Sequence, residues 1–255
     1  MLREGETDYL KKFYDSIYFN REELFTEMKN HSQGITEAFF KAKLQSLLDD
    51  GEVARVGRNA YCVCKVNDKT YSYDYSQEAY DISGLITDNY PYLDFRIFEL
   101  IQLNEFLNHQ IAHNTIFVSV EKDLGEFVFD SLKTVYPGKV LIYPTVEMFH
   151  QYWVEGMIVI LKLPTESPRG KGHVWATCIE KMMVDAFCEK VIVSAYPSEE
   201  ISSIIENMFQ QYAIDESKLF RYARRRGVEK KFRTFLHEKT NITLRLENRK
   251  NDNKK

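Results

Sequence analysis

Apolar residues in the first 65 positions recur with the periods of two helices followed by a hairpin. Asn20 and Glu23 form a capping-box pattern, and Thr36 is the expected N-cap of a second helix. A Gly-Arg-Asn sequence separates two short β-type runs and predicts a tight turn. The predicted elements are helices over 21–29 and 36–49 and strands over 52–56 and 60–63.

Helix, turn, helix and hairpin, in this order, predict a winged helix-turn-helix domain over residues 1–66. In DNA-binding domains of this kind the second helix enters the major groove and the hairpin contacts the backbone. The candidate DNA contacts on the helix are Thr36, Lys41, Lys43 and Gln45, and those in the hairpin are Arg55, Arg58 and Asn59. The domain carries a net charge of −1, so protein docking is the alternative use.

Strand-like and helix-like runs alternate after residue 66, which favours an α/β (α+β) fold class with a mixed α/β domain over 67–245. The predicted strands are 70–73, 93–98, 115–120, 139–143 and 157–163, and the chain is expected to become helical after 191–194. The predicted helices are 77–88, 102–109, 124–135, 146–153, 176–190, 198–212, 216–226 and 228–239. Residues 246–255 are polar and charged, and they are expected to form a flexible tail.

Composition narrows the class of protein. The chain has 255 residues, 44% of them apolar, which excludes disorder over the whole length. Four cysteines are too few for a disulfide scaffold, and no apolar run approaches the ~20 residues of a membrane helix. The first residues contain no signal-peptide pattern, so we expect a soluble protein of the reducing cytoplasm.

Charge is distributed unevenly along the chain. Residues 67–150 have a net charge of −8, whereas residues 151–255 have a net charge of +5. The strongest basic cluster is formed by Arg224, Arg225, Arg226, Lys230, Lys231 and Arg233. It predicts contact with a protein partner or a nucleic acid, and a solvated helix surface is the alternative. Neighbouring residues are 100° apart on a helix, so the three consecutive arginines cannot all face one way.

The sequence contains no recognisable catalytic constellation. His109 and His113 share helical spacing but lack the glutamate of a metalloprotease motif and an evident third ligand. The carboxylates form no pair with the lysine spacing of a metal-dependent nuclease. We therefore predict no catalytic residue, no metal and no cofactor, and do not expect an enzyme. The alternative is a metal-dependent nuclease or nucleotide-processing domain targeted by a winged helix.

Three colinear pieces of the chain carry a family resemblance. They are the hairpin region 51–61, the run Ala-Thr-Cys-Ile-Glu-Lys-Met-Met-Val-Asp at 176–185, and Leu-Phe-Arg-Tyr-Ala-Arg-Arg at 219–225. With these pieces the chain resembles the AbiEi-like antitoxins of type IV toxin–antitoxin (abortive infection) systems over about residues 15–240. It departs from their pattern at Cys178, where the family usually has Pro, and at Asn59-Ala60, which replace Gly-Val.

The resemblance implies a role in phage defence. It implies an N-terminal domain that binds operator DNA and represses transcription of its own operon. A winged helix usually reads DNA as a dimer on repeated half-sites, which predicts a homodimer on DNA. The resemblance also implies a C-terminal domain that opposes a nucleotidyltransferase-like toxin encoded beside it. Proteins of that family are not known as enzymes, and the resemblance implies no membrane partner.

Overall fold

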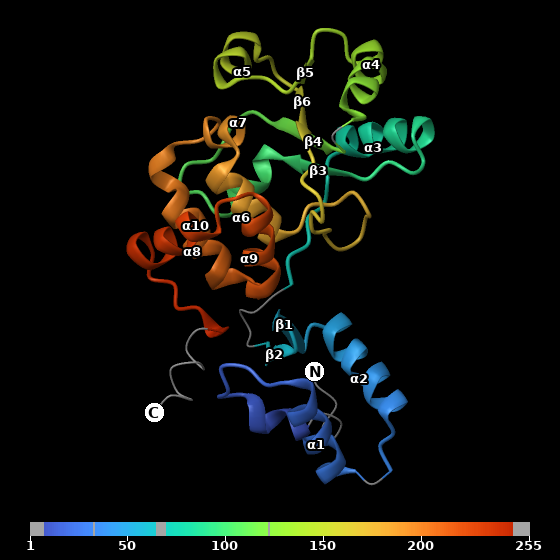
Figure 1. The fold of residues 1–255 in the computed structure, drawn as a ribbon, viewed down its shortest axis with the longest axis vertical. Helices are drawn as coiled ribbons and strands as arrows, with labels where there is room; N and C mark the ends of the chain where they lie inside the picture. The colour runs from blue at the N-terminus through green and yellow to red at the C-terminus, as the bar shows by residue number, and fades with distance from the viewer. Residues whose placement is uncertain (1–7, 33, 65–69, 122, 247–255) are drawn as a thin grey trace. The chain divides into compact units, whose positions relative to one another are not determined.

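The computed structural model describes residues 8–32, 34–64, 70–121 and 123–246 (Figure 1). Unit 1 contains the described residues of Met1–Thr70, Phe209–Lys218 and Ile242–Lys255, and unit 2 contains those of Tyr71–Met208 and Leu219–Asn241. The sequence-based division into 1–66, 67–245 and 246–255 treats each domain as continuous, whereas segments 209–218 and 242–246 belong to unit 1. Residues 247–255 of the predicted tail lie outside the described residues.

Unit 1 begins with three helices and a hairpin. These elements are η1 (Asp8–Phe13), α1 (Arg21–His31), α2 (Glu37–Asp49), β1 (Val53–Gly57) and β2 (Ala60–Val63). The capping box of α1 is complete, with hydrogen bonds of 2.9 Å and 2.7 Å between Asn20 and Glu23. The sequence prediction did not include η1. The predicted order of helix, turn, helix and hairpin is present, and the winged-helix interpretation stays a prediction.

The hairpin is antiparallel, and one isolated bridge adds a residue beside it. Val53 pairs with Val63, and an isolated bridge joins Phe19 to Tyr61. Asn59 in the turn has a φ of 53°, a left-handed conformation that Asn tolerates better than most residues. One face of this sheet packs on the buried apolar side chains of α1 and α2.

Unit 2 is built on a four-stranded mixed sheet in the order β3-β4-β6-β5. The strands are β3 (Phe95–Glu99), β4 (Thr115–Val120), β5 (Val140–Ile142) and β6 (Met157–Lys162). β3 is antiparallel to β4, whereas β4, β6 and β5 run parallel. Every residue of β3 and β4 is buried, which explains why β4 reads as a mostly apolar run. β3 buries the polar side chains of Arg96 and Glu99 as well.

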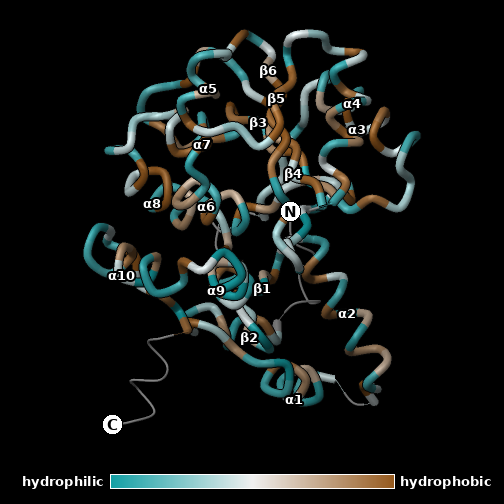
Figure 2. Tube along the Cα trace, turned by 45° about the horizontal axis from the view of Figure 1, so that its top comes forward, coloured by the Kyte–Doolittle hydropathy of each residue, from teal (hydrophilic) through white to brown (hydrophobic). Residues whose placement is uncertain are grey.

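Helices cover both faces of the sheet. On one face, α3 (Gln77–Asn89) and α4 (Gly125–Val135) bury apolar side chains against alternate strand residues. On the other face, Phe149 of α5 (Val146–Tyr152) packs against Phe117 of β4. In Figure 2 the strands appear as a hydrophobic centre with more polar helices around it. The predicted α/β fold class is confirmed.

The remaining helices of the chain follow the sheet or connect its strands. They are η2 (Leu100–Glu105), α6 (Ile179–Cys188), α7 (Lys190–Val193), η3 (Ser198–Glu200), α8 (Ile201–Gln211), α9 (Glu216–Arg225) and α10 (Glu229–Lys239). No helix in the described part of the chain is long and apolar enough to cross a membrane.

Three predicted elements differ from the structure. Residues 70–73 are not assigned to a strand, and Tyr71 is buried in the interior. The predicted helix over 102–109 is the shorter 3₁₀ helix η2. The helical part was expected only after 191–194, yet most of this segment already lies in α7, where burial of Val191 and Ile192 overrides the β preference of these residues.

Candidate nucleic-acid interface

Helix α2 presents one face to the core of unit 1 and the opposite face to solvent. Its buried residues, at helical spacing, are Phe40, Leu44 and Leu47. The Thr36 hydroxyl accepts a hydrogen bond of 3.2 Å from the Phe39 amide and so starts the helix. The cap and the buried face fix the rotation of α2, and the predicted contact residues Lys41 and Gln45 are exposed.

The exposed side of α2 carries two free cations and one oriented amide. Lys41 is exposed and Lys43 is half-buried, and neither has a hydrogen-bond or ion-pair partner among the described residues. The Gln45 amide nitrogen donates to the Asp49 carboxylate at 2.9 Å. This bond orients the amide and leaves its second N–H and its carbonyl oxygen for a ligand.

Carboxylates near these lysines are already engaged. Glu37 accepts a hydrogen bond of 2.9 Å from the guanidinium of Arg21, and Asp50 accepts one of 3.0 Å from the Ser46 hydroxyl. Exposed pairs of this kind add only about 0–1 kcal/mol to stability. Arg21 offsets the charge of Glu37 beside the exposed face of α2, and the Ser46 hydroxyl orients the carboxylate of Asp50.

Two arginines of the hairpin are exposed. The Arg55 Nε donates to the carbonyl of Gly57 at 3.3 Å. The Arg58 guanidinium has no partner among the described residues, while its backbone N–H donates to the Ser217 hydroxyl at 2.9 Å. The hairpin therefore contributes one free guanidinium at its turn, as the sequence pattern predicted for a phosphate contact.

Asn59 has a structural task that the sequence prediction did not assign to it. Its side-chain oxygen accepts a hydrogen bond of 3.1 Å from the Arg21 backbone N–H, at the first residue of α1. This bond satisfies one of the helix N–H groups that lack an intrahelical partner. Asn59 is exposed, but its oxygen acts within unit 1.

The C-terminal segments cover the second face of the hairpin. Ala54, Val56, Ala60 and Cys62 form an apolar cluster there, against which Ala213 and Leu246 pack. Glu216, only 2% exposed, accepts hydrogen bonds from the backbone N–H groups of Arg245 and Leu246 at 2.6 Å and 2.9 Å. Unit 1, which contains the candidate DNA contacts, therefore also includes residues from the C-terminal part of the chain.

A sequence signal for this cover exists, although the prediction did not use it. The outward positions of the two strands are apolar, and both faces of β2 are buried. A sheet with two apolar faces needs a cover on each side. Local spacing does not show which distant segment supplies the cover.

The predicted basic cluster on α9 and α10 is largely neutralised within the protein. Arg224 contacts Glu229 at 2.7 Å and 3.1 Å, and Arg225 pairs with Glu166. Arg233 contacts Glu229 at 3.3 Å and stacks on a phenylalanine ring. The hydrogen bond from Arg224 lowers the pKa of Glu229, so this carboxylate stays charged at neutral pH. Lys230 and Lys231 are exposed without a partner among the described residues.

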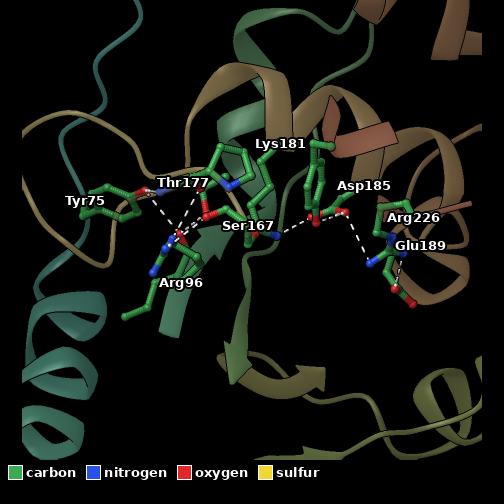
Figure 3. Close-up of polar contacts among 11 residues, drawn as sticks. Tyr75, Arg96, Ser167, Thr177, Lys181, Asp185, Glu189 and Arg226 are labelled. Atoms are coloured by element: carbon green, nitrogen blue, oxygen red, sulfur yellow. Dashed lines mark hydrogen bonds and ion pairs between the residues drawn. The ribbon is translucent and has the colours of Figure 1, made fainter. Parts of the chain in front are cut away.

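Arg226 follows the last residue of α9 and points inward. It contacts Glu189 at 2.8 Å and Asp185 at 3.5 Å (Figure 3). Asp185 also accepts a hydrogen bond of 2.9 Å from the hydroxyl of buried Tyr222 and forms an ion pair with buried Lys181. Burial, followed by the charge of Asp185, raises the pKa of Tyr222.

A second network of buried polar side chains lies at β3, the edge strand of the sheet. The Arg96 guanidinium, 1% exposed, contacts Asp94 at 2.7 Å and the carbonyl of Ser167 at 3.2 Å (Figure 3). The Tyr75 hydroxyl donates to a carbonyl of β3 and accepts from the Thr177 N–H at 2.9 Å. Burial raises the pKa of Tyr75 to about 12. These side chains are partnered inside the protein.

The motif at 176–185, which carries part of the family resemblance, belongs to these buried networks. Thr177, Glu180, Lys181 and Asp185 are all at most 5% exposed. They therefore support the packing of α6 and its neighbours, and they do not form a solvent-facing surface.

The other candidate groups do not converge on one site. His109 contacts Glu200 at 2.7 Å, whereas His113 lies 3.6 Å from Glu155. Among the described residues, no group of three or more His, Cys, Asp and Glu side chains could hold a metal ion. A cavity of about 530 Å³ lies in unit 1 between η1 and the start of α1, and its lining includes Lys12, Tyr18 and Glu22.

Comparison with known proteins gives a family and no named relative. No curated protein matches the chain. A family model described as a family of unknown function (DUF6577) matches residues 39–242, which include most of α2, the hairpin and the whole of unit 2. The chain therefore belongs to the DUF6577 family.

Proposed function

We propose that the protein is a DNA-binding regulator, in which unit 1 is a winged helix-turn-helix and α2 enters the major groove. The observation that carries the proposal is the exposed side of α2, where Lys41 and Lys43 lack partners within the part of the chain that the structure describes and the Gln45 amide is oriented by Asp49. Nearby carboxylates are engaged by other side chains. A helix of this shape and polarity fits the groove of B-DNA.

The exposed residues have different roles in this proposal. Lys41, Lys43 and Thr36 lie where a docked helix meets the phosphates that flank the groove. Gln45 is placed for a base edge, because its free N–H and carbonyl match the pattern of adenine. In the hairpin, Arg58 supplies a phosphate contact and Arg55 a second one nearby, while Asn59 holds the turn to α1.

The test uses the full chain and duplex DNA. A selected duplex, obtained from a random-sequence pool, is titrated with the wild type and with the double variant Lys41→Ala/Lys43→Ala. We expect the variant to bind at least about tenfold more weakly, and the salt dependence of log K to become shallower by about 0.9 per lost phosphate contact.

A matched control removes the same charge elsewhere. Lys230→Ala/Lys231→Ala deletes two exposed lysines of α10 that have no partner among the described residues. This control should bind the duplex within about twofold of the wild type, because the proposal assigns the DNA contacts to unit 1 alone. Equal affinity of the α2 variant and the wild type, or a larger loss in the α10 variant, would contradict the proposal.

The proposal extends to an antitoxin that represses its own operon and opposes a nucleotidyltransferase-like toxin. Its support is the resemblance of 51–61, 176–185 and 219–225 to the AbiEi-like family. Such a protein works in the cytoplasm, where its operator lies. A homodimer on two half-sites is the expected DNA complex, and light scattering of the complex gives its stoichiometry.

A growth assay tests this second part. The adjacent gene is induced alone and then together with this protein, and surviving colonies are counted. Toxicity that the protein relieves supports the antitoxin role. A harmless neighbour, or toxicity without relief, would remove it and leave DNA binding to be judged by the titration. The alternatives of a protein-docking module and of a nucleotide-processing enzyme have no specific support among the described residues.

A further inference from the structure

The N-terminal half of α2 exposes an apolar strip that the phosphate and amide contacts do not use. Phe39 is 56% exposed, and Ala38 and Ala42 are exposed beside it. On a helix, residues 38 and 42 lie on one line, with Phe39 at its rim. An exposed phenylalanine beside two alanines stabilises the folded chain little, so the strip suits contact with another molecule.

The apolar strip of α2 can contact DNA favourably only where the groove also exposes an apolar group. Phosphates and most base edges offer charge or hydrogen bonds, which a phenylalanine ring and alanine methyl groups cannot match. The major groove has one apolar feature, the C5-methyl group of thymine, and both Phe and Ala make contact with it. The small alanines also let the helix approach the base edges closely.

The neighbouring polar groups favour DNA as the occupant of this strip. Lys41 lies on the other side of the alanine line and Lys43 beside Phe39, so free positive charge flanks the apolar surface. This arrangement complements a groove with phosphates on both sides. One turn further on, the oriented amide of Gln45 matches adenine, the partner of thymine.

We infer that Phe39 is a specificity-determining residue that reads thymine methyl groups in an A·T-containing half-site. The inference rests on the proposed DNA-binding function and adds the class of base pair that α2 selects. Thr36, Lys41 and Lys43 then position the helix, whereas Phe39 and Gln45 discriminate between sequences.

The experiment removes only the methyl groups. The full chain is titrated with the selected duplex and with the same duplex in which deoxyuridine replaces thymine. We expect the wild type to bind the deoxyuridine duplex about threefold to fivefold more weakly for each contacted methyl group. Phe39→Ala should weaken binding to the thymine duplex by a similar factor, and it should bind the two duplexes almost equally.

Phe127→Ala is the matched control, since Phe127 is 57% exposed on α4 of unit 2. It should discriminate between the duplexes as the wild type does. The inference is overturned if the wild type binds both duplexes equally, or if Phe39→Ala keeps the full discrimination. A change in oligomeric state without a change in DNA affinity would assign the strip to protein contact and also overturn it.

Failure of the inference and failure of the proposed function give different results. Binding that depends on Lys41 and Lys43 but ignores the methyl groups overturns this inference alone. If no duplex binds, both the inference and the proposed DNA-binding function are overturned.

Discussion

The exposed side of α2 and the arginine cluster of α9 and α10 differ in their charge counts, yet each leaves two lysines without a partner among the described residues. The cluster has six cations within ten residues, 224–233, and four of them contact carboxylates in the structure. Helix α2 has two lysines and an overall charge near zero, yet both lysines lack partners among the described residues. The number of cations in a segment is therefore a poor guide to the positive charge that it offers to a ligand.

The physical reason lies in where the counter-charges come from. Glu166 and Glu189, which neutralise Arg225 and Arg226, are 59 and 37 positions away in the chain. Near α2 the pairing neutralises an anion instead of a cation, because the guanidinium of Arg21 pairs with the carboxylate of Glu37. Folding brings oppositely charged side chains together, and only the cations that remain unpaired contribute strongly to binding an anion.

The largest expected effect separates two neighbouring arginines. Arg226→Ala leaves Asp185 and Glu189 without this counter-charge, and we expect a loss of about 3–5 kcal/mol in the free energy of unfolding. Arg224→Ala breaks an exposed pair and should cost at most about 1 kcal/mol. Urea unfolding of both variants measures the difference. Similar losses for the two would mean that Arg226 is as peripheral as Arg224.

The second prediction concerns the cover of the hairpin. Glu216→Ala removes a buried acceptor of two backbone N–H groups, and it should lower the free energy of unfolding by about 2–4 kcal/mol. Amide hydrogen exchange should become faster in β1 and β2. Glu238→Ala, at an exposed position of α10, should stay within about 0.5 kcal/mol of the wild type. Unchanged protection of the hairpin in the Glu216 variant would show that the C-terminal cover is dispensable.

A third prediction uses the buried tyrosine beside the arginine cluster. Burial raises the pKa of Tyr222, so the folded chain keeps a proton that the unfolded chain releases above about pH 10. Stability is therefore unaffected below that pH and falls as the pH rises past it, by about 1.4 kcal/mol per pH unit for each such tyrosine. Tyr222→Phe should make the alkaline slope shallower by this amount. An unchanged slope in denaturation at pH 9.5, 10.5 and 11.5 would place Tyr222 in a solvated setting.

The smallest expected effects distinguish two hairpin residues that the sequence assigned to the same role. Asn59→Ala loses the bond to the Arg21 N–H and strains a left-handed backbone, which should cost about 1–2 kcal/mol of stability. Arg58→Ala should change stability by less than about 0.5 kcal/mol but weaken DNA binding. Thermal unfolding and DNA titration of both variants provide the comparison. If folded Asn59→Ala binds DNA more weakly than the wild type while Arg58→Ala binds as tightly, Asn59 is the DNA contact and Arg58 is not.

The spacing of apolar and polar residues predicted much of the fold correctly, in those elements that bury one face. The helix begun by Thr36, the hairpin and the strand Thr115–Val120 were predicted to within a residue or so. Prediction failed where tertiary contacts override local preference, as in α7, whose Val and Ile residues favour strands. Of the candidate site, Lys41 and Gln45 were placed on the exposed side of α2 from spacing alone, whereas the structural role of Asn59 was not apparent.

The sequence by itself determined the periodicity of each long element, the caps of α1 and α2 and the order of helices and hairpin, because these depend on residues within a few positions of one another. Only the tertiary structure decided which charges remain unpaired and what covers the outer face of the hairpin. Those outcomes depend on residues such as Glu166, Glu216 and Leu246, which folding brings to their partners from distant parts of the chain.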